Sequence, residues 1–323
     1  MQYRTFGRTQ LNVSEIGYGM WGLAGWTGTD DSELNKALDR SVELGCNFYD
    51  TAWGYGEGKS EQILGQLIRK HSDKRLFHAT KIPPKNFKWP SKSHYPLADC
   101  FPYDHIIEYT EKSLRNLGVD CIDLQQFHVW EDAWANQDEW KKAVEKLKQD
   151  GKIRFMGVSV NRWEPDNVLD TLRTGLIDTV QVIYNIFDQA PEDNLFPLCR
   201  QLGIGVIARV PFDEGSLTGM LTKDTTFPKD DWRSTYFVPE NLISSVEHAD
   251  ALRPLIPEGM TMPEMALRFI LANDDVHTII PGMRKIRHVE ANIRASDGRR
   301  LDPTLVQKLK GHRWDRTPTE WSQ

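Results

Sequence analysis

Four polar side chains lie at the ends of three short apolar stretches of the chain. Asp50 and Tyr55 follow the first stretch, Lys81 follows the second, and His128 follows the third. If these stretches are neighbouring parallel strands, their carboxyl ends meet at the edge where barrel enzymes build their sites. The spacing therefore predicts that a carboxylate, a phenol, an ammonium and an imidazole share one site.

Each of these side chains also has an ordinary structural role open to it. Asp50 could cap a turn, and Lys81 could be a solvated strand end. Tyr55 could be a surface aromatic residue, and His128 a structural histidine with satisfied hydrogen bonds. Their order on consecutive predicted strands favours a shared site over separate coincidences.

The chemistry that suits this set is protonation of a carbonyl oxygen. A phenol with its usual pKa of about 10 is a poor acid at neutral pH, and a buried ammonium beside Tyr55 is expected to lower that pKa by about 1–3. Asp50 would keep Lys81 charged, and His128 would orient the carbonyl oxygen. Because nothing in the set attacks the carbonyl carbon, a bound cofactor must supply a hydride.

The elements that must position these residues alternate between strand-like and helical patterns. Short apolar runs predict strands at residues 13–17, 46–49, 76–80, 122–127, 154–158, 179–183, 205–208 and 276–280. Helical spacing is clearest at residues 34–44, 61–68, 106–117, 140–147 and 168–172. Two helix start signals and three glycine stop signals accompany them, namely Asp30 and Asp104, then Gly45, Gly118 and Gly203.

Eight alternating units predict an α/β fold, a (β/α)8 TIM barrel formed as a single domain by residues 1–323. A doubly wound open sheet is the alternative. Residues 83–103 and 211–240 lengthen the pattern and are expected to form long loops at the C-terminal mouth.

One motif is set aside. Gly17-Tyr-Gly19-Met-Trp-Gly22 matches the GxGxxG pattern of dinucleotide-binding sheets, in which the third glycine opens a helix that meets the pyrophosphate. Here helical spacing begins only near Asp31. The match therefore does not support a Rossmann-type site.

Composition excludes several classes of protein. The 323 residues include 40 Lys+Arg and 46 Asp+Glu, a net charge of -6, which argues against nucleic-acid binding. No run approaches the ~18 apolar residues of a membrane span, and no secretory signal is expected because Met1 to Gly7 has no apolar core after a basic tip. The four scattered cysteines suit a reducing, cytoplasmic location. The nine scattered histidines disfavour a metal-dependent barrel hydrolase, so no metal is expected.

The segment 283–313 is locally basic, with nine Lys/Arg against three acidic residues. A solvated basic helix is the ordinary interpretation of such a run. The alternative is a site for a small molecule that carries a phosphate.

Taken together, the motifs resemble those of the aldo-keto reductase family over nearly the whole chain. The residues that carry the resemblance are Asp50-Thr-Ala-Trp-Gly-Tyr55-Gly, Ser60-Glu61, Lys81, Gln126-Phe-His128, Gly157-Val-Ser159, Val180-Gln181 and Ile280-Pro-Gly-Met-Arg284 with Asn292. The resemblance implies a barrel oxidoreductase that holds a nicotinamide cofactor and reduces aldehydes and ketones with NADPH. It also implies a catalytic tetrad of Asp50, Tyr55, Lys81 and His128.

Cofactor contacts are implied as well. Ser159 and Gln181 resemble the partners of the nicotinamide carboxamide. The family usually follows that serine with asparagine, whereas here Asn161 comes one residue later. Arg209 stands where many members have an aromatic residue, and a planar guanidinium can also stack on a ring.

The remaining implied contacts lie near the cofactor's other parts. They are Gly19, Met20, Trp21, Asp50, Pro211, Phe212, Gly215, Ser216, Leu217, Gly282, Met283, Arg284, His288 and Asn292. Residues 212–221 resemble the segment that covers the pyrophosphate. The resemblance assigns the 2′-phosphate to the basic residues around Arg284, with Arg287 or His288, and this favours NADPH over NADH.

Aromatic residues in the loops predict an apolar substrate pocket. Its expected members are Trp21, Trp53, Tyr55, Trp89, His128 and Trp130, with Trp26, Phe212 and Tyr236 as further aromatic candidates. The expected partner is a small carbonyl compound, and oligomeric state stays open. A second hypothesis is a cofactor-sensing binding subunit of the same fold with slow turnover.

Overall fold

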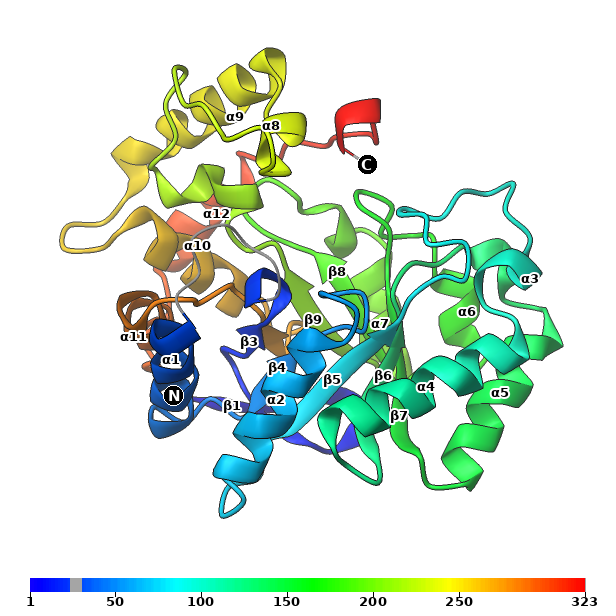
Figure 1. Ribbon diagram of the computed structural model, residues 1–323. Coiled ribbons are helices and arrows are strands. Elements are labelled where there is room, and N and C mark those ends of the chain that lie inside the picture. Colours follow the sequence, from blue (N-terminus) through cyan, green and yellow to red (C-terminus); the bar gives the residue numbers. More distant parts are fainter. Residues whose placement is uncertain (24–30, 323) are drawn as a thin grey trace.

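The centre of the computed structural model is a sheet of eight parallel strands in the order β10-β9-β8-β7-β6-β5-β4-β3. The structure describes residues 1–23 and 31–322. Isolated parallel bridges between Ile16 and Ile279 and between Gly19 and Gly282 join the two edges of the sheet. The predicted (β/α)8 barrel is therefore confirmed (Figure 1).

The barrel strands are short and mostly buried. Their bounds are β3 Tyr18–Gly19, β4 Phe48–Asp50, β5 Phe77–Ile82, β6 Ile122–Phe127, β7 Ile153–Ser159, β8 Thr179–Ile183, β9 Gly205–Arg209 and β10 Thr278–Ile279. Every residue of β5, β6 and β8 is buried, as is usual for parallel strands with side chains or helices on both faces.

Helices form the outer layer around these strands (Figure 1). Their bounds are α1 Asp31–Glu43, α2 Lys59–Lys70, α3 Leu97–Cys100, α4 Tyr103–Leu117, α5 Asp138–Gln149, α6 Leu169–Arg173, α7 Leu195–Leu202, α8 Arg233–Tyr236, α9 Pro239–Leu252, α10 Met262–Leu271, α11 Ile286–Arg294 and α12 Pro303–Lys310. In α5 the buried residues Trp140, Ala143, Val144 and Leu147 recur every three or four positions and face the sheet.

The first predicted strand, residues 13–17, is wrong. Asn12–Ser14 forms β2, which pairs antiparallel with β1, Tyr3–Thr5, and the barrel strand begins only at Tyr18. The reason is burial: Phe6 and Val13 pack on apolar side chains inside the N-terminal end of the barrel. The hairpin thus covers that end of the sheet.

The helix signals are confirmed in part. Gly118 and Gly203 end α4 and α7 with φ of 68° and 67°, a backbone conformation that favours glycine. Asp104 is not the cap of α4, which begins behind Pro102; it lies in the first turn, near the positive end of the helix. Asp30 lies outside the described residues.

The two long loops follow β5 and β9, at the carboxyl ends of the strands. The first contains α3, and the second contains a 3-10 segment, Asp213–Thr218, and α8. The C-terminal tail lies near α8 and α9 (Figure 1), where Trp321 packs against Trp163 and Tyr236. Among residues 1–23 and 31–322, no helix has the length and apolar character needed to cross a bilayer.

Candidate active site

A buried ion pair lies at the carboxyl ends of β4 and β5. Nζ of Lys81 lies 2.5 Å from Oδ1 of Asp50 and also donates to the carbonyl oxygen of Thr51 at 2.7 Å. Burial lowers the pKa of Lys81, but Asp50 and Tyr55 together more than offset this, so that the pKa is raised overall. Lys81 is therefore a charged ammonium in the core of the barrel.

The second oxygen of Asp50 is held from the opposite side. Oδ2 accepts hydrogen bonds from Nε2 of Gln181 at 2.8 Å and from Nε2 of Gln126 at 3.1 Å. These glutamines come from β8 and β6, and the Lys81 partner comes from β5. The carboxylate is thereby fixed by three other strands of the barrel.

Tyr55 approaches this pair from the loop after β4. Its hydroxyl oxygen lies 3.4 Å from Nζ of Lys81. Burial raises the pKa of Tyr55, and the nearby ammonium lowers it only partly, so that the pKa lies above its usual value. The predicted lowering of the pKa of Tyr55 is wrong, because the desolvation of the phenolate is a larger effect than the positive charge of Lys81.

His128 follows β6 and lies beside the phenol. The ring centroids of Tyr55 and His128 are 5.5 Å apart in an edge-to-face arrangement. Burial, and then the positive charges of Lys81 and Arg209, hold the pKa of His128 well below its usual value. The imidazole is therefore neutral at neutral pH, and its Nδ1 has no hydrogen-bond partner among the described residues.

The residues assigned to nicotinamide lie on the neighbouring strands β7, β8 and β9. Ser159 and Gln181 are paired in register at the ends of β7 and β8. Arg209 ends β9, and its Nη2 donates to the carbonyl oxygen of Val160 at 3.0 Å. Burial and then the charge of Arg162 lower the pKa of Arg209 to about 10. The Nε of Arg209 has no partner among the described residues.

Gly19 and Met20 lie next to this cluster, on the other side of Asp50. The backbone N–H of Met20 donates to the carbonyl oxygen of Asp50 at 2.9 Å. The Met20 side chain is fully buried. A side chain at Gly19 would meet the carbonyl oxygen of Ile280 at 2.6 Å, and the N–H of Gly19 donates to the carbonyl oxygen of Pro281 at 3.1 Å.

Asn161 is buried and is bonded to residues of the loops that follow β5, β6 and β7. Its amide nitrogen donates to Oε2 of Glu164 at 2.9 Å and to Oε1 of Glu131 at 3.1 Å. Its amide oxygen accepts from Oγ of Ser91 at 3.1 Å. Both ends of the side chain are thus bonded within the loops.

The segment after β9 is folded on itself. The backbone N–H groups of Gly215 and Leu217 both donate to the carbonyl oxygen of Phe212, at 2.9 and 3.1 Å. The hydroxyl of Ser216 donates to Oδ2 of Asp213 at 2.6 Å. The groups that the resemblance assigned to pyrophosphate therefore have partners inside the segment, while Phe212 itself is half-buried beside buried Pro211.

Two ion pairs hold this segment from outside. Nη2 of Arg162 lies 2.6 Å from Glu214. Nη2 of Arg316, in the C-terminal tail, lies 2.7 Å from Asp213 and 2.6 Å from Asp188. Sequence reasoning missed these arginines, because the partners of Arg316 lie far from it in the chain and no local pattern marks them.

Positive charge gathers where α11 begins. Arg284 is half-buried, and burial followed by the charge of Arg233 lowers its pKa. Burial, Arg287 and Lys285 lower the pKa of His288 in the same way. Met283 and Asn292 are buried, and Gly282 has open space where a side chain would stand. The start of a helix carries a partial positive charge, so the nearby cations make this region strongly positive.

The aromatic residues predicted for the substrate pocket differ in their exposure and packing. Trp89 is exposed, and its ring centroid lies 5.8 Å from that of His128. Trp53 packs on Tyr109 at 4.7 Å, and exposed Trp21 packs on Trp232 at 5.3 Å. Tyr236 is buried under the loops, and Trp26 lies outside the described residues.

The assignment of Trp130 to the substrate pocket is wrong. This residue is fully buried, stacks on Phe127 at 4.7 Å and packs edge-on against Trp134 and Trp140. Its indole N–H donates to Oγ1 of Thr171 at 2.7 Å. Trp130 is therefore a core residue between the barrel and its helices.

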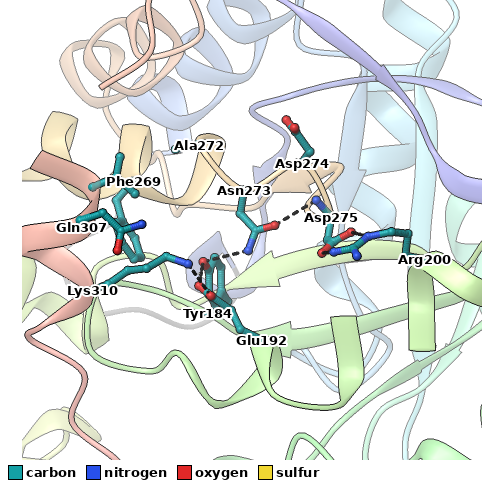
Figure 2. Close-up of a pocket in the computed structure, with 11 residues that line it drawn as sticks. Tyr184, Glu192, Arg200, Phe269, Ala272, Asn273, Asp274, Asp275, Gln307 and Lys310 are labelled. Carbon is teal, nitrogen blue, oxygen red and sulfur yellow. Dashed lines mark hydrogen bonds and ion pairs between the residues drawn. The ribbon is translucent and has the colours of Figure 1, made fainter. Parts of the chain in front are cut away.

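A separate groove lies away from these residues (Figure 2). Its polar side chains are paired with one another: Glu192 with Lys310 and Tyr184, and Arg200 with Asp275. It contains none of the predicted site residues. The strand ends thus remain the candidate site.

Known proteins resemble the chain in sequence and in fold. It matches the Aldo/keto reductase family over residues 15–313. An NADH-specific methylglyoxal reductase of Escherichia coli (strain K12) is 30% identical over 94% of this chain and 96% of that protein. An aldo-keto reductase of Schizosaccharomyces pombe named for NADP(+) is 28% identical over 91% of this chain and 87% of that protein. The holo form of aldo-keto reductase AKR11C1 from Bacillus halodurans has a TM-score of 0.78 and 28% identity, with 100% of both chains covered.

Fold and matches together define a barrel oxidoreductase. The chain belongs to the aldo/keto reductase family, whose members are NAD(P)H-dependent reductases that act on carbonyl compounds.

Proposed function

We propose that this protein reduces the carbonyl group of a small aldehyde or ketone to an alcohol with NADPH, and that Asp50, Tyr55, Lys81 and His128 are its catalytic residues. The observation that carries this proposal is the position of the Lys81 ammonium, which contacts Asp50 at 2.5 Å and Tyr55 at 3.4 Å. The family membership and the predicted tetrad support it.

The residues at the strand ends fit a nicotinamide nucleotide. Because Nε2 of Gln181 is bonded to Asp50, its oxygen is the end that can accept a hydrogen bond from a carboxamide. The unpartnered Nε of Arg209 lies at the same end of the barrel. When bound, NADPH supplies the hydride that the protein's own side chains cannot provide.

The remaining steps are carried by the chain. Tyr55 donates its hydroxyl proton to the carbonyl oxygen as the carbon receives the hydride, which yields the alcohol. The ammonium of Lys81 stabilises the phenolate that Tyr55 leaves behind. Neutral His128 has one ring N–H, which donates to the same carbonyl oxygen and orients it.

The cationic start of α11 supports NADPH as the cofactor. Arg284, with Lys285, Arg287 and His288 beside it, offers charge and hydrogen-bond donors to a 2′-phosphate, which NADH lacks. Asn292 lies on the same helix, where we place the adenine. Trp21, Trp53, Trp89 and Phe212 would form the walls around the substrate.

The test is NADPH oxidation by the purified protein over a panel of aldehydes, ketones and sugars, with Tyr55→Phe as the variant. We expect the substitution to lower kcat by about 10²–10⁴, while Tyr3→Phe, at an exposed tyrosine, leaves it unchanged. Full activity of Tyr55→Phe would refute the assigned proton donor. NADPH binding without turnover on any carbonyl would favour the cofactor-sensing hypothesis instead.

A further inference from the structure

A buried cluster of polar side chains joins three loops at the mouth of the barrel. Ser91 comes from the loop after β5, Glu131 from the loop after β6, and Asn161, Glu164 and Asn167 from the loop after β7. Ser91, Glu131 and Asn161 are each no more than 5% exposed. We call these five residues the loop cluster.

Asn161 lies at the centre of the loop cluster. Its amide nitrogen lies 2.9 Å from Oε2 of Glu164, 3.1 Å from Oε1 of Glu131 and 3.1 Å from the carbonyl oxygen of Trp130. Its amide oxygen accepts from Oγ of Ser91 at 3.1 Å. One side chain therefore contacts all three loops.

Glu131 completes the connection. Oγ of Ser91 lies 2.9 Å from the carbonyl oxygen of Trp130, 3.0 Å from Oε1 of Glu131 and 3.1 Å from Oδ1 of Asn161, so that these acceptors share its single proton. Oε2 of Glu131 accepts from Nδ2 of Asn167 at 3.1 Å. Because the described residues place no cation on Glu131, these neutral donors are what stabilises its buried carboxylate. Such a network is rigid when all members are satisfied and loosens when one is removed.

The loop cluster is next to the proposed substrate site. Trp89 is two residues before Ser91, and its ring lies edge-to-face with that of His128 at 5.8 Å. A side chain built on Gly54 would come within 3.7 Å of the Trp89 ring and 3.8 Å of His128. The ring of Trp89 therefore lies beside His128, where the proposed function places the carbonyl group.

The register of β7 explains why Asn161 turns toward the loops. Ser159 is the last residue paired with β8, opposite Gln181, and the N–H of Val160 still donates to the carbonyl oxygen of Gln181. Val160 is then buried in the core. The pairing between β7 and β8 therefore ends before Asn161, which is the first residue beyond the bonded part of the strand.

We propose that Asn161 is a positioning residue for the substrate wall and takes no part in binding the nicotinamide. Through Ser91 it fixes the loop that carries Trp89, and it thereby sets how well bulky aromatic carbonyl compounds fit. The proposal rests on the proposed function for its catalytic readout. Ser159 and Gln181 then hold the carboxamide without an asparagine.

The experiment compares Asn161→Ala and Ser91→Ala with Ser159→Ala. NADPH affinity is measured by fluorescence titration, and KM and kcat are measured for an aromatic aldehyde and for a short aliphatic aldehyde. We expect Asn161→Ala and Ser91→Ala to raise KM for the aromatic aldehyde about 3- to 10-fold, the effect of one or two lost hydrogen bonds. NADPH affinity and KM for the aliphatic aldehyde should stay within about twofold, and Ser91→Thr, which keeps the hydroxyl, should restore the aromatic KM.

The outcome that overturns the proposal is a tenfold or greater loss of NADPH affinity in Asn161→Ala, similar to that of Ser159→Ala. Equal losses on both aldehydes would also overturn it. Hydrogen–deuterium exchange of residues 84–95 provides a readout that needs no turnover: faster exchange is expected in Asn161→Ala and unchanged exchange in Ser159→Ala. If the natural protein reduced no carbonyl compound, the proposed function would fail, while NADPH affinity and exchange would still decide the role of Asn161.

Discussion

Nζ of Lys81 lies between Oδ1 of Asp50, at 2.5 Å, and the hydroxyl oxygen of Tyr55, at 3.4 Å. Both members of the ion pair are almost completely shielded from solvent. Because a buried charge is tolerated only with a partner, each of the two charges depends on the other. The Lys81 ammonium group is therefore important both for the stability of the core and for the proposed proton transfer.

Replacing Lys81 by methionine tests this dependence. Lys81→Met leaves Asp50 without its cation, and we expect the free energy of unfolding to fall by about 3–5 kcal/mol. The double variant Lys81→Met/Asp50→Asn should recover part of this loss yet stay inactive. Urea denaturation and NADPH oxidation measure the two effects, and a single variant as stable as the natural protein would contradict the prediction.

The pH profile of reduction reports on Tyr55. Since burial raises the pKa of this phenol above its usual value, the hydroxyl stays protonated through neutral pH. We expect kcat/KM for reduction to stay level from about pH 6 to about pH 9 and to fall only where a tyrosine with a raised pKa ionises. A fall centred between about pH 7 and 8 would show that the donor has a lowered pKa instead.

The stability of the protein should fall in weak acid because of His277. Its Nδ1 accepts a hydrogen bond from the N–H of Val206 at 3.0 Å, and burial, followed by the charge of Arg4, lowers its pKa to about 4. The unfolded chain takes up this proton near pH 6.5. Between these values the unfolded state binds more protons, so the free energy of unfolding decreases as the pH falls.

His277→Gln is the variant that isolates this effect. Denaturation by urea at several pH values between about 7.5 and 4.5 should give a shallower dependence on pH than in the natural protein. The dependence should not vanish, because the pKa of His128 is also lowered. An unchanged slope would exclude His277 as a contributor.

Arg284 is the residue on which the cofactor preference should depend most. We expect Arg284→Ala to weaken NADPH binding by about 1–3 kcal/mol, the range of a hydrogen bond to a charged group, and to change NADH binding much less. Lys308→Ala removes an exposed charge from the same basic segment and serves as the matched control. Equal affinity of Arg284→Ala and the natural protein for NADPH would refute the assignment.

Arg316 should control how long the nucleotide stays bound. It pairs with Asp213, in the segment after β9, and with Asp188. We expect Arg316→Met to free this segment and to raise the rate of NADPH release about tenfold. Arg313→Met, which removes the exposed pair with Asp193, should leave the rate unchanged in stopped-flow measurements.

The sequence alone predicts those candidate-site residues that lie at the ends of neighbouring strands. Asp50, Lys81 and His128 lie at or next to the ends of consecutive strands, and parallel strands place such residues together without further information. Tyr55 could be predicted as part of the same site because it follows Asp50 by only five residues. The barrel itself follows from eight alternating patterns of similar length.

Other features depend on contacts that no local pattern contains. The apolar run around Val13 suits a barrel strand as well as the hairpin, and only packing with Phe6 decides between them. Trp130 looks like any loop tryptophan until its stacking on Phe127 is seen. The same holds for the direction in which the pKa of Tyr55 shifts, because that direction depends on whether desolvation outweighs the effect of Lys81.

The closure of the barrel has a consequence for how the chain matures. The two edges of the sheet are joined by Gly17 N–H to Ile279 and Gly19 N–H to Pro281, contacts that span most of the chain. Contacts of such long separation form late, so a nascent chain is expected to carry an open strand edge until residues near Pro281 leave the ribosome. Since Arg284 follows this join directly, the proposed nucleotide site would be assembled only in the last stage of folding.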